Sequence, residues 1–388
     1  MILLGKTILW INTPRAISYM PYAMRHMPRA MCLFACLLAA LLVTCAPHDV
    51  CGQEPKTLAL LPFENVSGSI DSIRIMMPVI QQSLTAKGYR IVPPEKIEPF
   101  LARNRIRNPG MLSRRQLNDL KPAFEADVAM VGSVDLFHQS EENPQWGISS
   151  RAVSTNDGRI LWAESTGRTG GDYTGLLGLG TITSSSALAR EVVKILFEDL
   201  PPSGSPFPVP QGQRTQTVGF LSTRAGYRSP VLDTSARWRV AVATFENQSE
   251  RYGAGLILAH VLTTALFRHG RYEVADPGEL GAALITLGRT PYGGLDFTTL
   301  RELKKRAGVN AIFLGTVYRY NEGLKQGAST SPEISQDIRM LDTESGKILW
   351  FGSAERNGDK YQTVLDFGTI RSMVPLIRKT MGEMLGTL

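Results

Sequence analysis

A glutamate, an asparagine and a serine follow one another in the same order at two places in the chain. They are Glu64, Asn65 and Ser67, and again Glu246, Asn247 and Ser249. Each set ends a short apolar run that reads as a buried strand. Open α/β sheets hold ligands at the carboxyl ends of their strands, and the free N–H groups of a following helix suit an anion. The motif could therefore serve acid–base chemistry or ligand binding, or it could simply form a turn that starts a helix.

We favour the turn, because a lone carboxylate lacks a chemical partner. Acid–base or nucleophilic chemistry needs a second group within hydrogen-bond reach. His138, His260 and His269 lie in unrelated contexts, and no two of them stand at metal-ligand spacing with a carboxylate. Asn and Ser side chains readily hydrogen-bond backbone groups just after them. We therefore predict that the six motif residues are structural turn and cap residues, with no catalytic, cofactor or metal site.

The cysteines are confined to one end of the chain. All four, at positions 32, 36, 45 and 51, lie within the first 51 residues. The sequence beyond them therefore offers no cysteine for a disulfide framework, a zinc site or a nucleophile.

The same end carries an export signal. A 14-residue apolar stretch, Met31–Thr44, follows Arg25 and Arg29, and it is too short for an ordinary membrane span. The letters Leu-Val-Thr-Cys that end at Cys45 resemble a bacterial lipobox, which predicts a lipid on Cys45. Thr44 departs from the usual small residue, so ordinary cleavage near Cys51 is the alternative.

The net charge does not point to nucleic acid. The formal charge is +7, but four basic residues precede the first acidic one, Asp49, which leaves 38 basic and 35 acidic residues. These basic residues are scattered and form no stripe. A nucleic-acid partner is therefore not expected.

Further landmarks repeat in the same order as the motif. Phe63 and Phe245 lie 182 positions apart, Gly132 and Gly315 lie 183 apart, and Trp162 and Trp350 lie 188 apart. The offset grows only in expected loops. The pattern predicts a tandem duplication of one domain.

Hydrophobic periodicity predicts the same elements in both copies. In the first copy the expected strands are 57–63, 89–92, 127–138, 146–155 and 160–167, and the expected helices are 70–87, 94–103, 114–125 and 182–200. In the second copy the expected strands are 239–245, 272–274, 311–320, 334–341 and 348–353, and the helices are 255–268, 277–287, 298–307 and 370–385. The fold class is thus α/β (α+β), with two tandem repeats, each a mixed sheet flanked by helices and closed by a β-hairpin and a helix.

These elements set the predicted boundaries. They are a signal peptide at 1–45 (with a possible mis-assigned start upstream of the true one), a tether at 46–56, repeats at 57–200 and 237–388, and a linker at 201–236 rich in Pro, Gly and Ser.

The motifs carry a resemblance to a known group. A strand that ends in Phe-Glu-Asn-x-Ser, an Ala-Asp-x-x-x-x-Gly-x-Val strand and an Asp-Gly-x-Ile-x-Trp hairpin resemble the CsgG/LpoB/TolB-N-terminal group of bacterial envelope proteins and the GNA-type lipoproteins. The resemblance covers both repeats and carries over no catalytic residue. It implies an exported protein, anchored at the outer membrane by its lipid and facing the periplasm, or else soluble in the periplasm.

The resemblance also implies how such a protein works. It suggests a non-enzymatic envelope lipoprotein that needs no cofactor and binds other envelope proteins, or itself, during assembly or transport. The alternative is a subunit of an oligomeric secretion complex of the curli type. Such a pore needs long amphipathic hairpins, whereas the connection Asn321–Pro332 is polar and shows no alternation. An enzyme of unknown chemistry is the third option.

Overall fold

The computed structural model describes residues 56–174, 180–210, 225–233, 235–290, 295–325, 328–329, 331–363 and 368–388. They belong to one compact unit, Gln53–Leu388. The predicted signal peptide, the lipidation site Cys45 and all of the tether except Lys56 lie outside the described residues. Within the described part of the chain, no helix has the length and apolar character to span a membrane.

The first sheet is mixed and has the order β3-β1-β4-β5-β6, with β2 paired beside β4. Its strands are β1 (Thr57–Leu60), β2 (Glu64–Asn65), β3 (Arg90–Ile91), β4 (Val128–His138), β5 (Gln145–Ser154) and β6 (Ile160–Thr169). β1 is parallel to β3 and β4, because helices connect them, whereas β4, β5 and β6 form an antiparallel meander.

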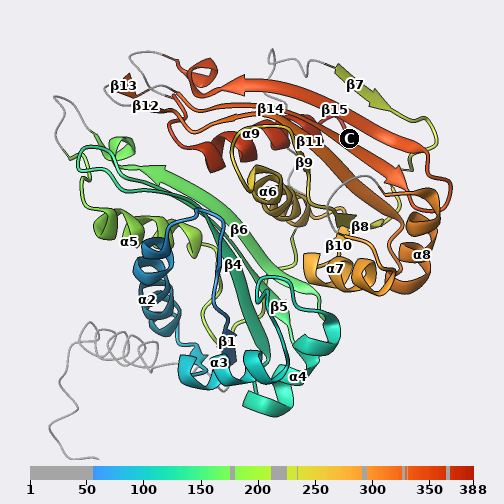
Figure 1. The fold of residues 1–388 in the computed structure, drawn as a ribbon, viewed down its shortest axis with the longest axis horizontal. Coiled ribbons are helices and arrows are strands. Elements are labelled where there is room, and N and C mark those ends of the chain that lie inside the picture. Colours follow the sequence, from blue (N-terminus) through green and yellow to red (C-terminus); the bar gives the residue numbers. More distant parts are fainter. Residues whose placement is uncertain are drawn as a thin grey trace, which may run out of the picture. The chain divides into compact units, whose positions relative to one another are not determined.

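Helices flank this sheet (Figure 1). They are α2 (Ile70–Ala86), α3 (Pro94–Arg103), α4 (Arg114–Phe124) and α5 (Ser185–Leu196). α2 and α5 pack on one face through residues such as Met76, Ile80 and Leu188. α3 and α4 cover part of the other face through residues such as Ile97 and Leu117. Ser113 forms the capping box that starts α4.

The second sheet repeats the first, with the order β10-β8-β11-β14-β15 and with β9 beside β11. Its strands are β8 (Arg239–Val242), β9 (Glu246–Asn247), β10 (Glu273–Val274), β11 (Ala311–Asn321), β14 (Glu333–Asp342) and β15 (Ile348–Asn357), and its helices are α6 (Ala254–His269), α7 (Pro277–Thr286), α8 (Phe297–Ala307) and α9 (Met373–Leu385). The predicted fold class is confirmed, and the two sheets share one strand order, while a tandem duplication stays a prediction.

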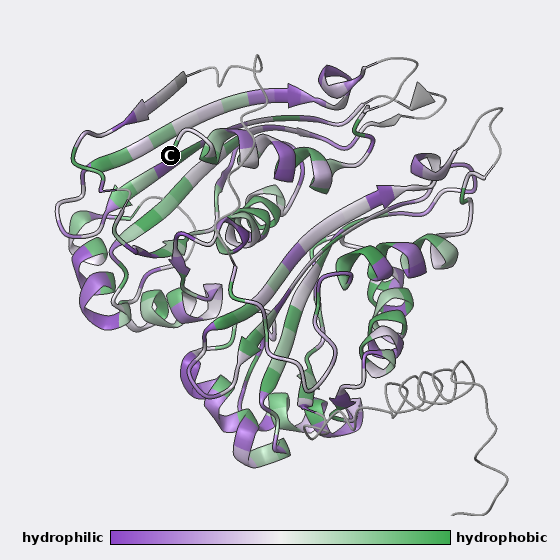
Figure 2. Ribbon diagram, turned by 180° about the vertical axis from the view of Figure 1, so that it is seen from behind, coloured by the Kyte–Doolittle hydropathy of each residue, from purple (hydrophilic) through white to green (hydrophobic). Residues whose placement is uncertain are grey.

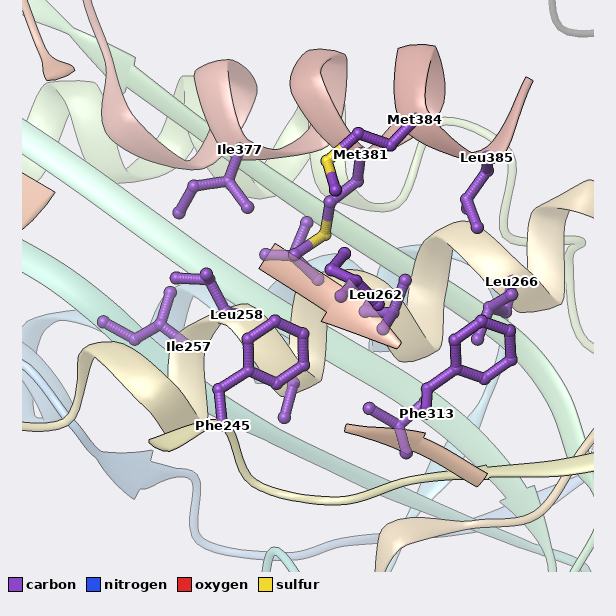
Figure 3. Close-up of a cluster of buried hydrophobic side chains, with 14 of the residues drawn as sticks. Phe245, Ile257, Leu258, Leu262, Leu266, Phe313, Ile377, Met381, Met384 and Leu385 are labelled. Atoms are coloured by element: carbon purple, nitrogen blue, oxygen red, sulfur yellow. The ribbon is translucent and has the colours of Figure 1, made fainter. Parts of the chain in front are cut away.

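The core of the second repeat lies between its sheet and the pair α6 and α9. Figure 3 shows Leu258 and Leu262 of α6 and Met381 of α9 gathered around Phe245 and Phe313. α6 differs from an ordinary surface helix, because apolar residues occupy every side of it and eleven of its residues are buried. A helix that is apolar all round must be covered on more than one side. The green colour of this helix in Figure 2 reflects that composition.

The predicted linker contains more structure than its composition suggests. β7 (Ala225–Arg228) pairs antiparallel with β15 at the edge of the second sheet. Earlier in the segment, the Ser203 N–H donates to the carbonyl of Lys87 at 2.9 Å, and Phe207 packs against the first core. Residues 211–224 and 234 lie outside the described residues. These two parts of the segment are therefore tied to the two repeats, and the linker at 201–236 with its boundaries stays a prediction.

The connection between β11 and β14 also gains two strands. β12 (Leu324–Lys325) and β13 (Ala328–Ser329) form a hairpin of two residues a side. Its strands are much shorter than the amphipathic hairpins that a curli-type pore requires.

Candidate functional site

Asn65 closes the loop between β2 and α2. Its Nδ2 donates to the carbonyl of Ser69 at 2.8 Å, and its Oδ1 accepts from Ser67 Oγ at 2.7 Å and from the Gly68 N–H at 3.0 Å. The N-cap of α2 is Ser69, and no side chain hydrogen-bonds to that helix start as a cap. Asn65 and Ser67 therefore hold the loop in front of the helix instead of capping its first N–H groups.

Asn247 does the same in the second repeat. Its Nδ2 donates to the carbonyl of Arg251 at 2.8 Å, and its Oδ1 accepts from Ser249 Oγ at 2.6 Å. The N-cap of α6 is Gly253, which has no side chain to cap with. A structural role for the motif stays a prediction. The hydrogen bonds of its asparagines close a loop and do not cap the first N–H groups of the helix.

The two glutamates of the motif lie in different surroundings. Glu64 is half-buried beside Gly110, and its Oε2 has no hydrogen-bond partner within the described residues. Glu246 is exposed, and its Oε1 accepts from Gln248 Nε2 at 3.0 Å. Neither carboxylate meets a histidine or a second acid in the described chain, and there no group of three His, Cys, Asp or Glu could hold a metal ion.

The polar cluster that the structure does assemble lies between the two repeats. Asp135 on β4 is fully buried and accepts from Ser133 Oγ at 2.6 Å and from Ser149 Oγ at 2.5 Å. The same Ser133 Oγ lies 2.9 Å from Nδ1 of His260 on α6. The single hydroxyl proton of Ser133 goes to Asp135, so Nδ1 of His260 must carry the proton that joins the two side chains.

Serine, histidine and aspartate side by side might suggest a catalytic triad, but the order of contacts is wrong. In a triad the histidine takes the serine proton and the acid orients the histidine. Here the acid accepts from the serine, and His260 is only 5% exposed. This cluster of three side chains is buried. It satisfies buried polar groups at a contact between protein layers.

Ion pairs join the repeats on either side of this cluster. Glu164 on β6 pairs with Arg268 of α6 and with Arg378 of α9, the latter at 2.5 Å. Burial raises the pKa of Glu164, and the two guanidinium groups offset this only in part. Ser165 Oγ lies 2.9 Å from Thr264 Oγ1 on α6.

A second ion pair is buried more deeply. Arg151 on β5 donates from Nε to Asp276 at 2.5 Å, and both side chains are less than a tenth exposed. Arg151 also donates to the carbonyl of Gly110, while Asp276 accepts from the Gly278 N–H at the start of α7. The pair thus fixes α7 of the second repeat against the first sheet.

We define the covered face as one set of positions on the first sheet. Its members, all less than a tenth exposed, are Ser133, Asp135, Ser149, Arg151, Ala163 and Ser165. Helices of the second repeat hold it by the hydrogen bonds and ion pairs above, and apolar side chains of both repeats join in one cluster. Where β5 passes α9, a Cβ on Gly147 would lie 2.8 Å from Val374 Cγ2.

The pairing registers identify the equivalent positions in the second repeat. Ser133 pairs with Ser149 in the first sheet, as Thr316 pairs with Asp337 in the second. The equivalent set, which we define as the open face, is Thr316, Tyr318, Asp337, Arg339, Phe351 and Ser353. Tyr318 is 46% exposed, Arg339, Phe351 and Ser353 are partly exposed, and Thr316 and Asp337 are buried between them.

The open face also holds unused hydrogen-bonding capacity. Tyr318 OH donates to Asp337 Oδ2 at 2.6 Å. Asp337 Oδ1 and Arg339 Nε are buried yet have no hydrogen-bond partner within the described chain. Such groups cost free energy unless a partner satisfies them.

Comparisons with known proteins find similar solved structures but no matching family. No protein-family model matches the chain, and no curated protein matches it. Similar solved structures include the PelC dodecamer from Paraburkholderia phytofirmans, which is 15% identical with a TM-score of 0.30 over 42% of this chain and 93% of that one. Lipoprotein GNA1162 from Neisseria meningitidis is 18% identical with a TM-score of 0.28 over 37% of this chain and 96% of that one.

The C-terminal domain of LpoB from Escherichia coli is also similar. It is 15% identical with a TM-score of 0.24 over 31% of this chain and 82% of that one. LpoB and a GNA-type lipoprotein are thus found among the similar structures, as the motifs predict, while a likeness to CsgG or TolB stays a prediction. At these TM-scores the matches carry no argument about function.

Proposed function

We propose that the chain is a non-enzymatic protein of the bacterial cell envelope that works by binding other envelope proteins during assembly or transport. The observation that carries the proposal is the open face. Its equivalent on the first sheet is covered by protein, and the open face presents aromatic and arginine side chains, the types that dominate protein interfaces. Its unpartnered Asp337 and Arg339 atoms would be satisfied by a polar partner.

The test is a photo-crosslinking amino acid placed at Tyr318 in cells. We expect a defined crosslinked product from position 318, and none from the control position Ile285 on α7, which is 73% exposed and outside the open face. Crosslinks of equal yield from both positions, or from neither, would contradict a binding role for the open face.

The proposal includes a lipid anchor on Cys45 and a place at the outer membrane, facing the periplasm. The residue after Cys45 is Ala46, not the aspartate that favours retention at the inner membrane. Cys45→Ala should move the protein from the membrane fraction to the soluble periplasmic fraction, because the acyl chains provide the attachment. Unchanged fractionation would contradict lipidation and leave the soluble periplasmic alternative.

The second candidate is a subunit of an oligomeric secretion complex. One observation favours it: the contact between the repeats joins a sheet face to a helix pair, so it joins two different surfaces. Contacts of that kind, repeated between chains, build rings or filaments.

A further inference from the structure

The helix pair α2 and α5 of the first repeat is equivalent to the pair α6 and α9 that holds the covered face. The buried positions of α2 are Ser72, Met76, Ile80 and Leu84, and those of α6 at the same spacing are Ala254, Leu258, Leu262 and Leu266. The offset between these helices is therefore 182 residues, as between Phe63 and Phe245. α5 and α9 are related by 188, which brings Leu188 to Leu376.

This correspondence shows what α2 and α5 would present to a sheet. His260 and Thr264, which touch the covered face, correspond to Pro78 and Gln82, and both of these are exposed. Arg378, which pairs with Glu164, corresponds to Arg190. Arg190 is exposed and forms no ion pair within the described residues.

The outer side of this pair is hollowed. A groove of about 680 Å³ runs between α2 and α5, and Val79, Gln82, Arg190 and Lys194 are among the residues that line it. Ile75 and Val79, which correspond to Ile257 and Val261, remain partly exposed beside it. α2 therefore offers an apolar strip beside a groove that α5 lines with charged side chains, among them Arg190, Glu191 and Lys194.

We propose that the open face binds the helix pair α2–α5 of a second copy of this chain, in the geometry by which the covered face binds α6–α9. This inference rests on the proposed function and names the partner of the same face. In that geometry Gln82 meets Ser353, as Thr264 meets Ser165. Pro78 lies over Thr316 and Tyr318, the equivalents of Ser133 and Asp135.

The charges agree with this occupant. Arg378 donates to the carbonyl of Ser165 as well as to Glu164. In the equivalent contact, Arg190 of the second copy therefore lies at Ser353. The register partner of Ser353 is Asp337, whose Oδ1 has no partner within the described chain. An arginine from the second copy supplies the donor that this buried carboxylate oxygen lacks.

The contact is heterologous, because one side is a sheet and the other is a helix pair. Each added copy covers the open face of its neighbour with its own helix pair. Its own open face stays free, and the helix pair of the first copy stays free at the other end. Assembly therefore proceeds head to tail, to a closed ring or an open filament.

The test uses the full chain with one surface blocked at a time. Pro78→Arg places a charge on the helix pair, and Tyr318→Arg places one on the open face. We expect the wild type and the control Ile285→Arg to assemble, and each blocked variant to stay monomeric by sedimentation and mass photometry. An equal mixture of the two blocked variants should form particles of about twice the monomer mass and nothing larger, since only one intact pair of surfaces remains.

Three results would overturn the inference: a monomeric wild type, blocked variants that assemble like the wild type, or a mixture that stays monomeric. Circular dichroism checks folding, and Gln82→Arg and Ser353→Arg replace either variant that fails to fold. A monomeric wild type whose position 318 still crosslinks to a different envelope protein contradicts the self-contact alone. A monomer without any crosslink from position 318 contradicts the proposed function as well.

Discussion

The two sheets have the same strand order, yet one face of the first is covered by protein and the equivalent face of the second is open. Ser165 is fully buried against Thr264, while its equivalent Ser353 remains partly exposed. Both carboxylate oxygens of Asp135 accept hydrogen bonds from serines. On the open face Asp337, the equivalent of Ser149, has one carboxylate oxygen without a partner among the described residues. The difference shows that this layout can bind a helix pair on that face, and the proposal extends this capacity to the second repeat.

The helices show the same difference from the other side. α6 is apolar on all sides because it lies between two sheets, and α2 turns Pro78 and Gln82 outward because only one sheet of its own chain covers it. The exposure of each repeat's surface thus depends on whether the other repeat packs against it.

The largest effect should come from the buried ion pair. Arg151→Ala leaves Asp276 buried without a cation, which should lower the free energy of unfolding by about 3–5 kcal/mol. The matched change Arg339→Ala on the open face should cost about 1 kcal/mol or less, because Arg339 forms no ion pair with the residues that the structure describes. Urea unfolding measures both. Equal losses would mean that the two faces do not differ as described.

A steric change separates the faces next. Gly147→Val drives a side chain into Val374 and should lower stability by about 1–3 kcal/mol. Its equivalent on the second sheet is Ser335, where valine should be neutral, because the position is partly exposed and valine suits a strand. A tolerated Gly147→Val, seen as an unchanged unfolding midpoint, would argue against close packing of α9 on β5.

The loop asparagines should matter less and equally in both repeats. Asn65→Ala and Asn247→Ala each remove the hydrogen bonds that close a loop, and each should cost on the order of 1 kcal/mol. Thermal unfolding reports the loss, and crosslinking from position 318 should survive both changes. Normal stability with lost crosslinking in both variants would instead indicate a ligand site at the strand ends.

The smallest effect is a pH dependence at the covered face. Burial raises the pKa of Glu164 above its ordinary 4.5, so its carboxylate binds a proton more tightly in the folded state than in the unfolded chain. The stability that this adds is complete below pH 4.5 and is lost as the pH rises through the raised pKa. Glu164→Gln should therefore gain stability relative to the wild type over that rise, measured by urea unfolding at a series of pH values. If the stability difference between Glu164→Gln and the wild type instead closes or reverses as the pH rises, attraction to Arg268 and Arg378 outweighs the burial of Glu164.

Much of the fold is predictable from local pattern. α3 begins and ends at the predicted Pro94 and Arg103, because a proline start and a clear apolar stripe mark it. β7 was not predicted, because its four residues come after a run of Pro, Gly and Ser and gain their order from pairing with β15. Pairing between distant segments leaves no periodic signal in so short a strand.

The covered face could have been predicted only in part. Ser133 and Asp135 alternate with apolar residues on one strand, and polar residues run from Ser149 to Arg151 on the next, which ordinarily indicates a face in water. The sequence signal for a second covering layer is that α6 is apolar on all sides. Which polar face meets that helix depends on how the two repeats pack. No sequence motif around His260 predicts Ser133 as its partner.

Equivalent faces of the two sheets differ in their access to solvent, and thiol labelling measures that access directly. The chain has no cysteine after Cys51. Single changes Ser165→Cys and Ser353→Cys therefore place one reporter at matched positions, to be read against the parent chain. Ser165→Cys should react at least roughly a hundredfold more slowly than Ser353→Cys under native conditions, because its reaction waits for the repeats to open. Equal labelling rates in the folded protein would contradict the account.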